Sequence, residues 1–231
     1  MLKLLTISSA LALAGIALAQ TSFDKEVCDI TLLQTKEVKT ELKVTQVQRD
    51  KMNSVSSSYN IVAKRVEEKM RKGQEPSADD QKQMRTQFEK MRTGVLNILT
   101  PVQIKRLREI SLQTAGLIAL TDPTVAKKVG ISGGQMTKLK GYLKDSYEQV
   151  GKLTKGVQDK VEKEFKGKNP KTDAEKRKLA EQYEKRMNEE MKKIAPKLEK
   201  IRNDGRTRIM NALSAGQRTI WNTLLGKPFN P

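Results

Sequence analysis

A five-residue pattern occurs four times in the chain: an aliphatic residue, then Ser or Thr, two variable positions and Gln. A Ser or Thr just before a helix accepts a hydrogen bond from the third helical N–H, and a Gln at that third position accepts one from the Ser or Thr N–H. Each pattern therefore predicts the start of a helix. The patterns are Val44, Thr45 and Gln48; Leu99, Thr100 and Gln103; Ile131, Ser132 and Gln135; and Leu213, Ser214 and Gln217.

Residues that carry catalysis are scarce. The sequence has no His and one Cys, Cys28, which excludes His general bases, Ser–His nucleophiles and the usual zinc sites. Adjacent carboxylates such as Glu189 and Glu190 fit a charged helix surface, and no glycine-rich phosphate loop occurs. We expect no enzyme activity and no catalytic, cofactor-binding or metal-binding residue. Cys28 is interpreted as incidental, with a disulfide between two chains as the alternative.

The positions of the patterns indicate an internal duplication. Residues around the first pattern match residues around the third at an offset of 87, and Leu99 matches Leu213 at an offset of 114. Between them, Ser77 and Thr172 each follow a loop that contains Pro and open a further helix. We predict two tandem units, 20–118 and 119–231, with the same order of helices. The extra length of the second unit is expected in the helix after Thr172.

The composition predicts an all-α fold. Hydrophobic residues make up 36% of the chain and charged residues 31%, a balance typical of long amphipathic helices. Apolar residues recur at spacings of three and four along 52–66 and 179–201, and no convincing alternating run indicates a strand. Gly141, Gly151 and Gly156 should make one helix bendable, and Pro196 should kink or break the last long helix.

Residues 1–19 have the pattern of a secretory signal peptide. Lys3 is followed by a mostly apolar stretch, and Ala17-Leu18-Ala19 fits a cleavage site after Ala19. We expect a mature protein that starts at Gln20 and is periplasmic, with an uncleaved membrane anchor as the alternative. No other segment has enough consecutive apolar residues to cross a bilayer, so stable membrane insertion is not expected.

The charge of the chain predicts acidic partners. Residues 20–231 carry 44 basic and 27 acidic side chains, a net charge of +17. The first unit accounts for about +5 and the second for about +12. Export argues against nucleic acid, and the nine aromatic residues are too scattered to suggest base stacking. A charged surface that only keeps the protein in solution is the simpler alternative.

Together these features resemble the LTXXQ-motif periplasmic family, the Spy/CpxP-like proteins. Leu99-Thr100-Pro101-Val102-Gln103 matches its motif fully, the patterns at Ile131 and Leu213 are close variants, and the one at Val44 is the loosest. The resemblance implies helical-hairpin units that form a curved cradle, commonly as a dimer, and hold unfolded proteins without ATP. Two units in one chain depart from that arrangement, so one chain could form the whole cradle as a monomer or weak homodimer.

We therefore predict an ATP-independent, holdase-like chaperone of the cell envelope with no cofactor. Its partners would be unfolded or partly folded envelope proteins with acidic segments. Two alternatives stay open: a stress-regulatory protein that binds one sensor domain, and a structural binder of anionic envelope polymers. Met residues on the helix seams are core packing or an adaptable binding surface, and the patterns do not locate the client-binding residues.

Overall fold

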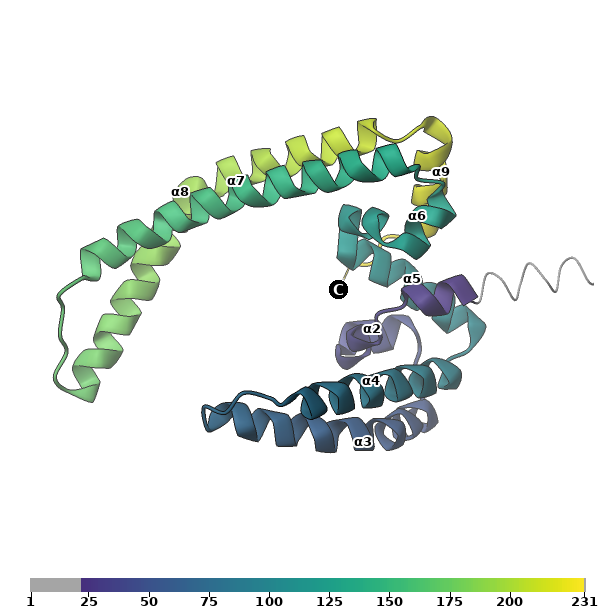
Figure 1. Cartoon of the computed structure of the whole chain (residues 1–231), viewed down its shortest axis with the longest axis horizontal. Coiled ribbons are helices and arrows are strands. Elements are labelled where there is room, and N and C mark those ends of the chain that lie inside the picture. The colour runs from purple at the N-terminus through teal and green to yellow at the C-terminus, as the bar shows by residue number, and fades with distance from the viewer. Residues whose placement is uncertain (1–21, 231) are drawn as a thin grey trace, which may run out of the picture. The chain divides into compact units, whose positions relative to one another are not determined.

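The computed structural model describes residues 22–230, and every regular element in that range is helical (Figure 1). The predicted signal peptide, residues 1–19, lies outside the described residues. None of the described helices has both the length and the apolar content that crossing a bilayer requires.

The chain divides into two compact units. The first ends at Gly116 and takes in the C-terminal segment from Asn222 onward, and the second is Leu117–Trp221. The C-terminal segment therefore packs with the first unit, whereas the sequence analysis placed all of 119–231 in the second.

The two units have the same order of elements. Each has a 3-10 turn, a short helix, two long helices and a helix that starts on the second capping pattern. In the first unit these follow a short helix at 22–27 and are η1 (Ile30–Gln34), α2 (Lys36–Glu41), α3 (Gln46–Arg71), α4 (Ala78–Ile98) and α5 (Pro101–Ala115). In the second they are η2 (Gly116–Thr121), α6 (Pro123–Val129), α7 (Gly133–Phe165), α8 (Asp173–Asn211) and α9 (Ala215–Leu225), of which α9 runs past the unit boundary.

The long helices of the first unit, α3 and α4, pair through a narrow apolar seam. Tyr59 and Phe88 meet edge to face with ring centroids 5.7 Å apart, an arrangement that aromatic rings favour. Gly94 lets the helices approach, because a Cβ there would lie 3.3 Å from Val55 Cβ. The end of this hairpin away from its loop packs on a core that includes Leu33 of η1, Val38 of α2 and Ile104 of α5.

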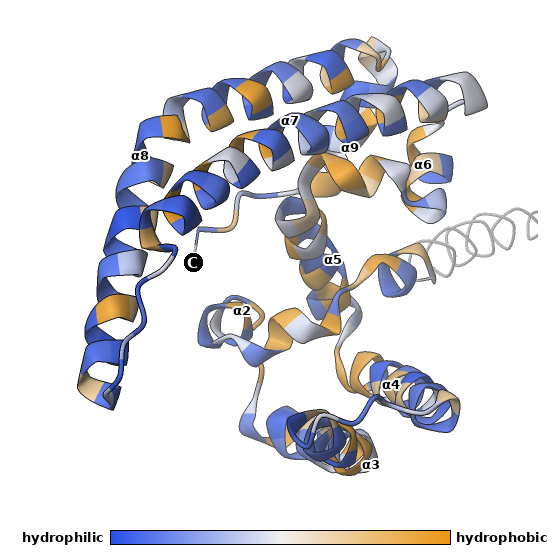
Figure 2. Cartoon of the chain, turned by 60° about the vertical axis from the view of Figure 1, so that its left-hand side comes forward, coloured by the Kyte–Doolittle hydropathy of each residue, from blue (hydrophilic) through white to orange (hydrophobic). Residues whose placement is uncertain are grey.

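The helices of the second hairpin, α7 and α8, also pair through a narrow apolar seam, and this seam is longer. Leu139, Val157 and Val161 of α7 and Leu198 and Ile209 of α8 are buried, and Figure 2 shows the rest of both helices as mainly hydrophilic. The helices have 33 and 39 residues, against 26 and 21 for α3 and α4. The extra length thus lies in both helices, not only in the one after Thr172.

Pro196 does not break its helix, because α8 continues from Asp173 to Asn211 with the proline inside it. A proline removes one N–H from the helix, which leaves the carbonyl four residues earlier, at Lys192, without its helical donor. Lys192 and Pro196 are both exposed, so water can supply that hydrogen bond.

Candidate functional site

All four predicted patterns form capping boxes. In each box the Gln N–H donates to the Ser or Thr hydroxyl over 3.2–3.3 Å, and the Ser or Thr N–H donates to the Gln Oε1 over 2.9–3.1 Å. These boxes begin α3, α5, α7 and α9. Leu99 and Leu213, which precede two of the boxes, are buried at 5% and 3% exposure, so each anchors its helix start in the interior of its unit.

The two glutamines of the first unit also bind each other. Gln48 Nε2 donates to Gln103 Oε1 over 2.8 Å, and Gln103 Nε2 donates to Gln48 Oε1 over 3.1 Å. Their other amide hydrogens reach main-chain carbonyls, from Gln48 to Ile98 and from Gln103 to Leu42. Each side chain therefore makes four hydrogen bonds, which is all that a primary amide can make.

The second unit repeats this arrangement. Gln135 and Gln217 donate to each other over 2.8 and 2.9 Å. Gln135 also donates to the Ala212 carbonyl over 2.8 Å, and Gln217 donates to the Gly130 carbonyl over 2.6 Å. In both units the starts of two helices that are distant in sequence are therefore fastened together.

The pairing explains why all four patterns contain Gln rather than Glu. A carboxylate can accept from the N-cap N–H but has no hydrogen to donate, so it cannot serve both partners. The other two capping boxes, at the hairpin tips, contain Asp80 and Glu175 in this position, where a negative charge suits a helix N-terminus. The pairing was not predicted from the sequence, although the uniform choice of Gln was a signal for it.

A buried ion pair joins α5 to the short helix at 22–27. Arg108 Nε donates to Asp24 Oδ1 over 2.9 Å, and both side chains are at most 5% exposed. The Arg108 guanidinium also donates to the Leu224 carbonyl. The two residues lie 84 positions apart in the chain, and their pairing was not predicted from the sequence.

The C-terminal segment is held against α5 by further hydrogen bonds. Gln113 Nε2 donates to the carbonyls of Leu225 and Lys227, and the Phe229 N–H donates back to Gln113 Oε1 over 2.8 Å. Arg106 also donates to the Lys227 carbonyl. Phe229 itself packs on the core of the first unit, so these residues are structural.

Cys28 lies in that core and donates from its thiol to the Ile104 carbonyl over 3.4 Å. Burial raises the pKa of the Cys28 thiol to about 12. The thiol is therefore protonated at neutral pH, and only a thiolate reacts readily with disulfides or oxidants.

The first unit contains a groove that could bind a ligand. Its volume is about 310 Å³, and it runs between η1 and the facing sides of α3 and α4. Six of its twelve lining residues are apolar, two of them methionines, and we call these six its floor; the other six are polar or charged and include Lys39 and Arg49. The apolar lining residues are Ile30, Leu33, Met52, Tyr59, Met91 and Val95.

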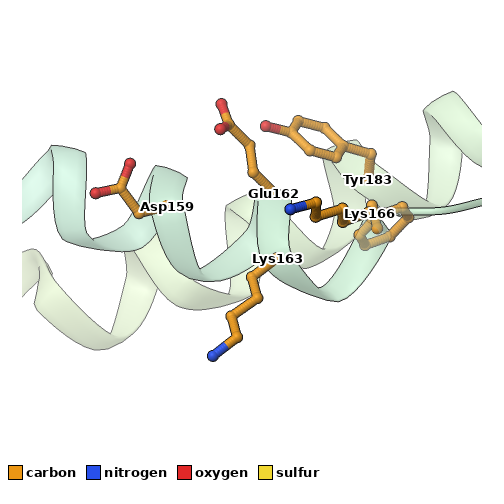
Figure 3. A pocket seen from close by; sticks show the side chains of 6 residues that line it. Asp159, Glu162, Lys163, Lys166 and Tyr183 are labelled. Carbon is orange, nitrogen blue, oxygen red and sulfur yellow. The ribbon is translucent and has the colours of Figure 1, made fainter.

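The tip of the second hairpin carries a more open hollow of about 730 Å³. Phe165 and Tyr183 meet there edge to face at 5.3 Å, with the Lys168 ammonium 4.0 Å from the centre of the Phe165 ring. Figure 3 shows the Tyr183 hydroxyl directed toward the side of Glu162 and Lys163 directed away. Charges of both signs around an open hollow give no single ligand chemistry.

Charged clusters hold each hairpin closed. Asp80 accepts hydrogen bonds from Lys69 and Ser77, which lower the pKa of its carboxyl well below the usual range. In the second hairpin, hydrogen bonds from Lys193 and Lys160, with Arg186 nearby, lower the pKa of Glu190 to about 2. Among residues 22–230, no group of three or more Cys, Asp or Glu side chains has the geometry of a metal site.

Comparison of the chain with protein-family models, with curated proteins and with solved structures finds no match. The candidate site therefore rests on geometry, and the groove of the first unit is the described feature best suited to hold part of another molecule.

Proposed function

We propose that this chain is an ATP-independent, holdase-like binding protein of the cell envelope, similar in mode of action to the LTXXQ-motif periplasmic family. The observation that carries this proposal is the groove of the first unit. A floor with Met52 and Met91 can adapt to side chains of different shapes, because methionine is flexible and polarisable. Such a floor favours weak binding of many apolar segments over one precise ligand.

The two cations that line the groove add a preference for acidic segments. Lys39 and Arg49 are both half-buried, so an extended chain that places an apolar side chain on the floor can place a carboxylate against either cation. The basic charge of the whole chain would speed the encounter with such segments. The predicted signal peptide supports an envelope location. Binding in an open groove needs no ATP, which suits that location.

The proposal is tested by suppression of aggregation of several unrelated unfolding proteins without nucleotide. Met52→Ser with Met91→Ser should lower suppression at least threefold, because the groove loses both methionines, two of its six apolar lining side chains. Val102→Ser is the matched control, because Val102 is 79% exposed on α5 and does not line the groove. Thermal unfolding of each variant separates lost binding from lost stability.

Three outcomes would contradict the proposal. One is that the wild-type chain suppresses no aggregation. Another is that the groove variant retains full activity. The third is tight one-to-one binding of a single partner with no effect on other clients, which would favour the sensor-binding alternative.

A further inference from the structure

The positive charge of the second hairpin is concentrated in one half. We call residues 133–158 of α7 and 192–211 of α8 the lysine-rich zone. These ranges lie together across the hairpin, as shown by the Arg208–Asp145 ion pair at 3.0 Å and by Arg208 over the Tyr142 ring at 4.3 Å. The zone has 12 basic and 4 acidic side chains, whereas the rest of the hairpin, 159–191, has 10 and 9.

Few cations form ion pairs in either half. Among the described residues, three of ten do so in 159–191 and four of twelve in the zone, so the halves differ in net charge and not in pairing. In 159–191, Arg186 pairs with Glu164 at 2.6 Å and with Glu190 at 2.7 Å, and Lys160 pairs with Glu190 at 2.9 Å. In the zone all 12 basic side chains are exposed. Within the described part of the chain, eight of them form no ion pair: Lys138, Lys140, Lys152, Lys155, Lys192, Lys197, Arg202 and Arg206.

This arrangement works against the stability of the hairpin. Like charges three or four residues apart on a helix repel each other, and the zone contains several such pairs, including Lys140 with Lys144 and Arg202 with Arg206. Gly151 and Gly156 add to the cost, since a Cβ at either position would meet no atom within 4 Å and no packing requires a glycine. Neither feature is explained by the pairing of α7 with α8.

The kind of cation and its placement indicate the partner. Nine of the 12 basic residues are Lys, which acts as a mobile point charge, whereas bidentate recognition of phosphate favours Arg. Each residue turns the helix by about 100°, so Lys138 and Lys140 point to nearly opposite sides of α7. A flat membrane would meet one side only, whereas a flexible chain can follow several.

Apolar contact is available beside these charges. Tyr147 is 61% exposed and lies three residues after Lys144 and seven after Lys140, on the same side of α7. A polypeptide that has carboxylates with an occasional apolar side chain matches this surface in both respects.

We propose that the lysine-rich zone binds acidic, unstructured polypeptide segments and is a second client surface, distinct from the apolar groove of the first unit. This inference rests on the proposed function in that the ligand is an unfolded polypeptide. It adds a place and a chemical class: carboxylate-rich segments in the second unit.

The test uses the full chain and a fluorescently labelled, disordered peptide in which Glu alternates with neutral residues. Binding is followed by anisotropy at low salt and at about 0.3 M salt. The zone variant carries Lys138→Gln, Lys140→Gln, Lys152→Gln and Lys155→Gln. The matched control, Lys163→Gln, Lys171→Gln, Lys178→Gln and Lys185→Gln, removes the same charge from exposed lysines of 159–191.

We expect the zone variant to bind the peptide about tenfold more weakly at low salt and the control to stay within about twofold of wild type, because the local field decides affinity. High salt should remove the difference. Equal weakening in both variants would overturn the proposal in favour of net charge alone, and so would absence of binding by wild type.

Two further arms identify the partner. Tighter binding of wild type to vesicles with anionic lipid, or to a carboxylated polysaccharide, than to the peptide would overturn the choice of polypeptide. Suppression of aggregation of a neutral client by the zone variant separates the two proposals, because that activity depends on the groove. Its survival with loss of peptide binding supports both, and its absence from wild type contradicts the proposed function alone.

Discussion

The two units are alike where their paired helix starts lie and differ in their hairpins. Both fasten two helix starts with a reciprocal glutamine pair, through Gln48 and Gln103 in one and Gln135 and Gln217 in the other. Their hairpins differ in length and in charge. Each glutamine pair fixes where the first long helix of the hairpin (α3 or α7) and the helix after the hairpin (α5 or α9) begin, so the rest of the hairpin can differ in length and charge.

The two units differ most in how deeply their ion pairs are buried. Arg108→Met should therefore lower the free energy of unfolding more than any other substitution below. It leaves the Asp24 carboxylate buried without its partner, which typically costs about 3–5 kcal/mol. In the second hairpin, Lys160→Met should cost about 1 kcal/mol or less, since Lys160 is half exposed and Glu190 keeps Lys193 and Arg186. Urea unfolding followed by circular dichroism measures both, and similar losses would contradict the comparison.

Replacing a paired glutamine tests whether the glutamine pair stabilises both units. Gln103→Glu and Gln217→Glu each remove two donated hydrogen bonds and should destabilise their unit by about 2–4 kcal/mol. Glu175→Gln, at an exposed carboxylate box, is the control and should cost less than about 1 kcal/mol. Fluorescence of Trp221, the one tryptophan and buried at 2% exposure, reports on the second unit.

The same variants should respond to pH in a definite direction. The introduced carboxyl can donate only when protonated, so its pKa should be raised in the folded state. Its protonated form then supports folding below its ordinary pKa, and this support is lost as the pH rises. The gap in melting temperature between Gln103→Glu and wild type should therefore narrow below about pH 4. A gap that widens there would exclude a donor role for Gln103.

Gly151→Ala tests whether packing requires a glycine in the second hairpin, as it does at Gly94 in the first. The added methyl group meets no atom within 4 Å, so the helix should be stabilised by about 1 kcal/mol. Gly94→Ala is the contrast in the first hairpin, because its Cβ would lie 3.3 Å from Val55 and the packing offsets the gain. A rise in melting temperature for both would show that neither hairpin needs its glycine.

The clusters that close the hairpins give the smallest expected effect. The pKa of Glu190 is lowered to about 2 by its hydrogen-bonded cations. A lowered folded pKa contributes stability above the ordinary pKa of Glu and loses it as the pH falls toward 2. The melting temperature of wild type should therefore fall toward that of Glu190→Gln between about pH 5 and pH 2. If the melting temperatures of wild type and Glu190→Gln changed in parallel with pH, Glu190 would not stabilise the fold through its lowered pKa.

Local features of the structure were predictable from sequence, and distant contacts were not. The capping boxes at Thr100 and Ser132 depend on neighbours three residues apart, so their spacing predicted them. The Gln48–Gln103 pair joins positions 55 residues apart, and the contact between Gln113 and Phe229 spans 116. No period in the sequence encodes such separations, and only the uniform choice of Gln hinted at one of them.

Pro196 was predicted to kink or break its helix, and α8 continues through it without a break, for a related reason. The missing N–H is a local property, but its cost depends on whether water can reach the freed carbonyl, and that depends on which side of α8 packs on α7. The placement of the last residues with the first unit likewise depends on the Arg108 and Gln113 side chains, which are unremarkable in sequence.

The thiol of Cys28 can report how often the core of the first unit opens. Since the thiol is buried with a pKa of about 12, a maleimide or disulfide reagent should modify it only when the surrounding core opens. The labelling rate at neutral pH, divided by the rate for the unfolded chain, then gives the fraction of time that the core is open. No reporter has to be engineered, because no second cysteine competes for the reagent.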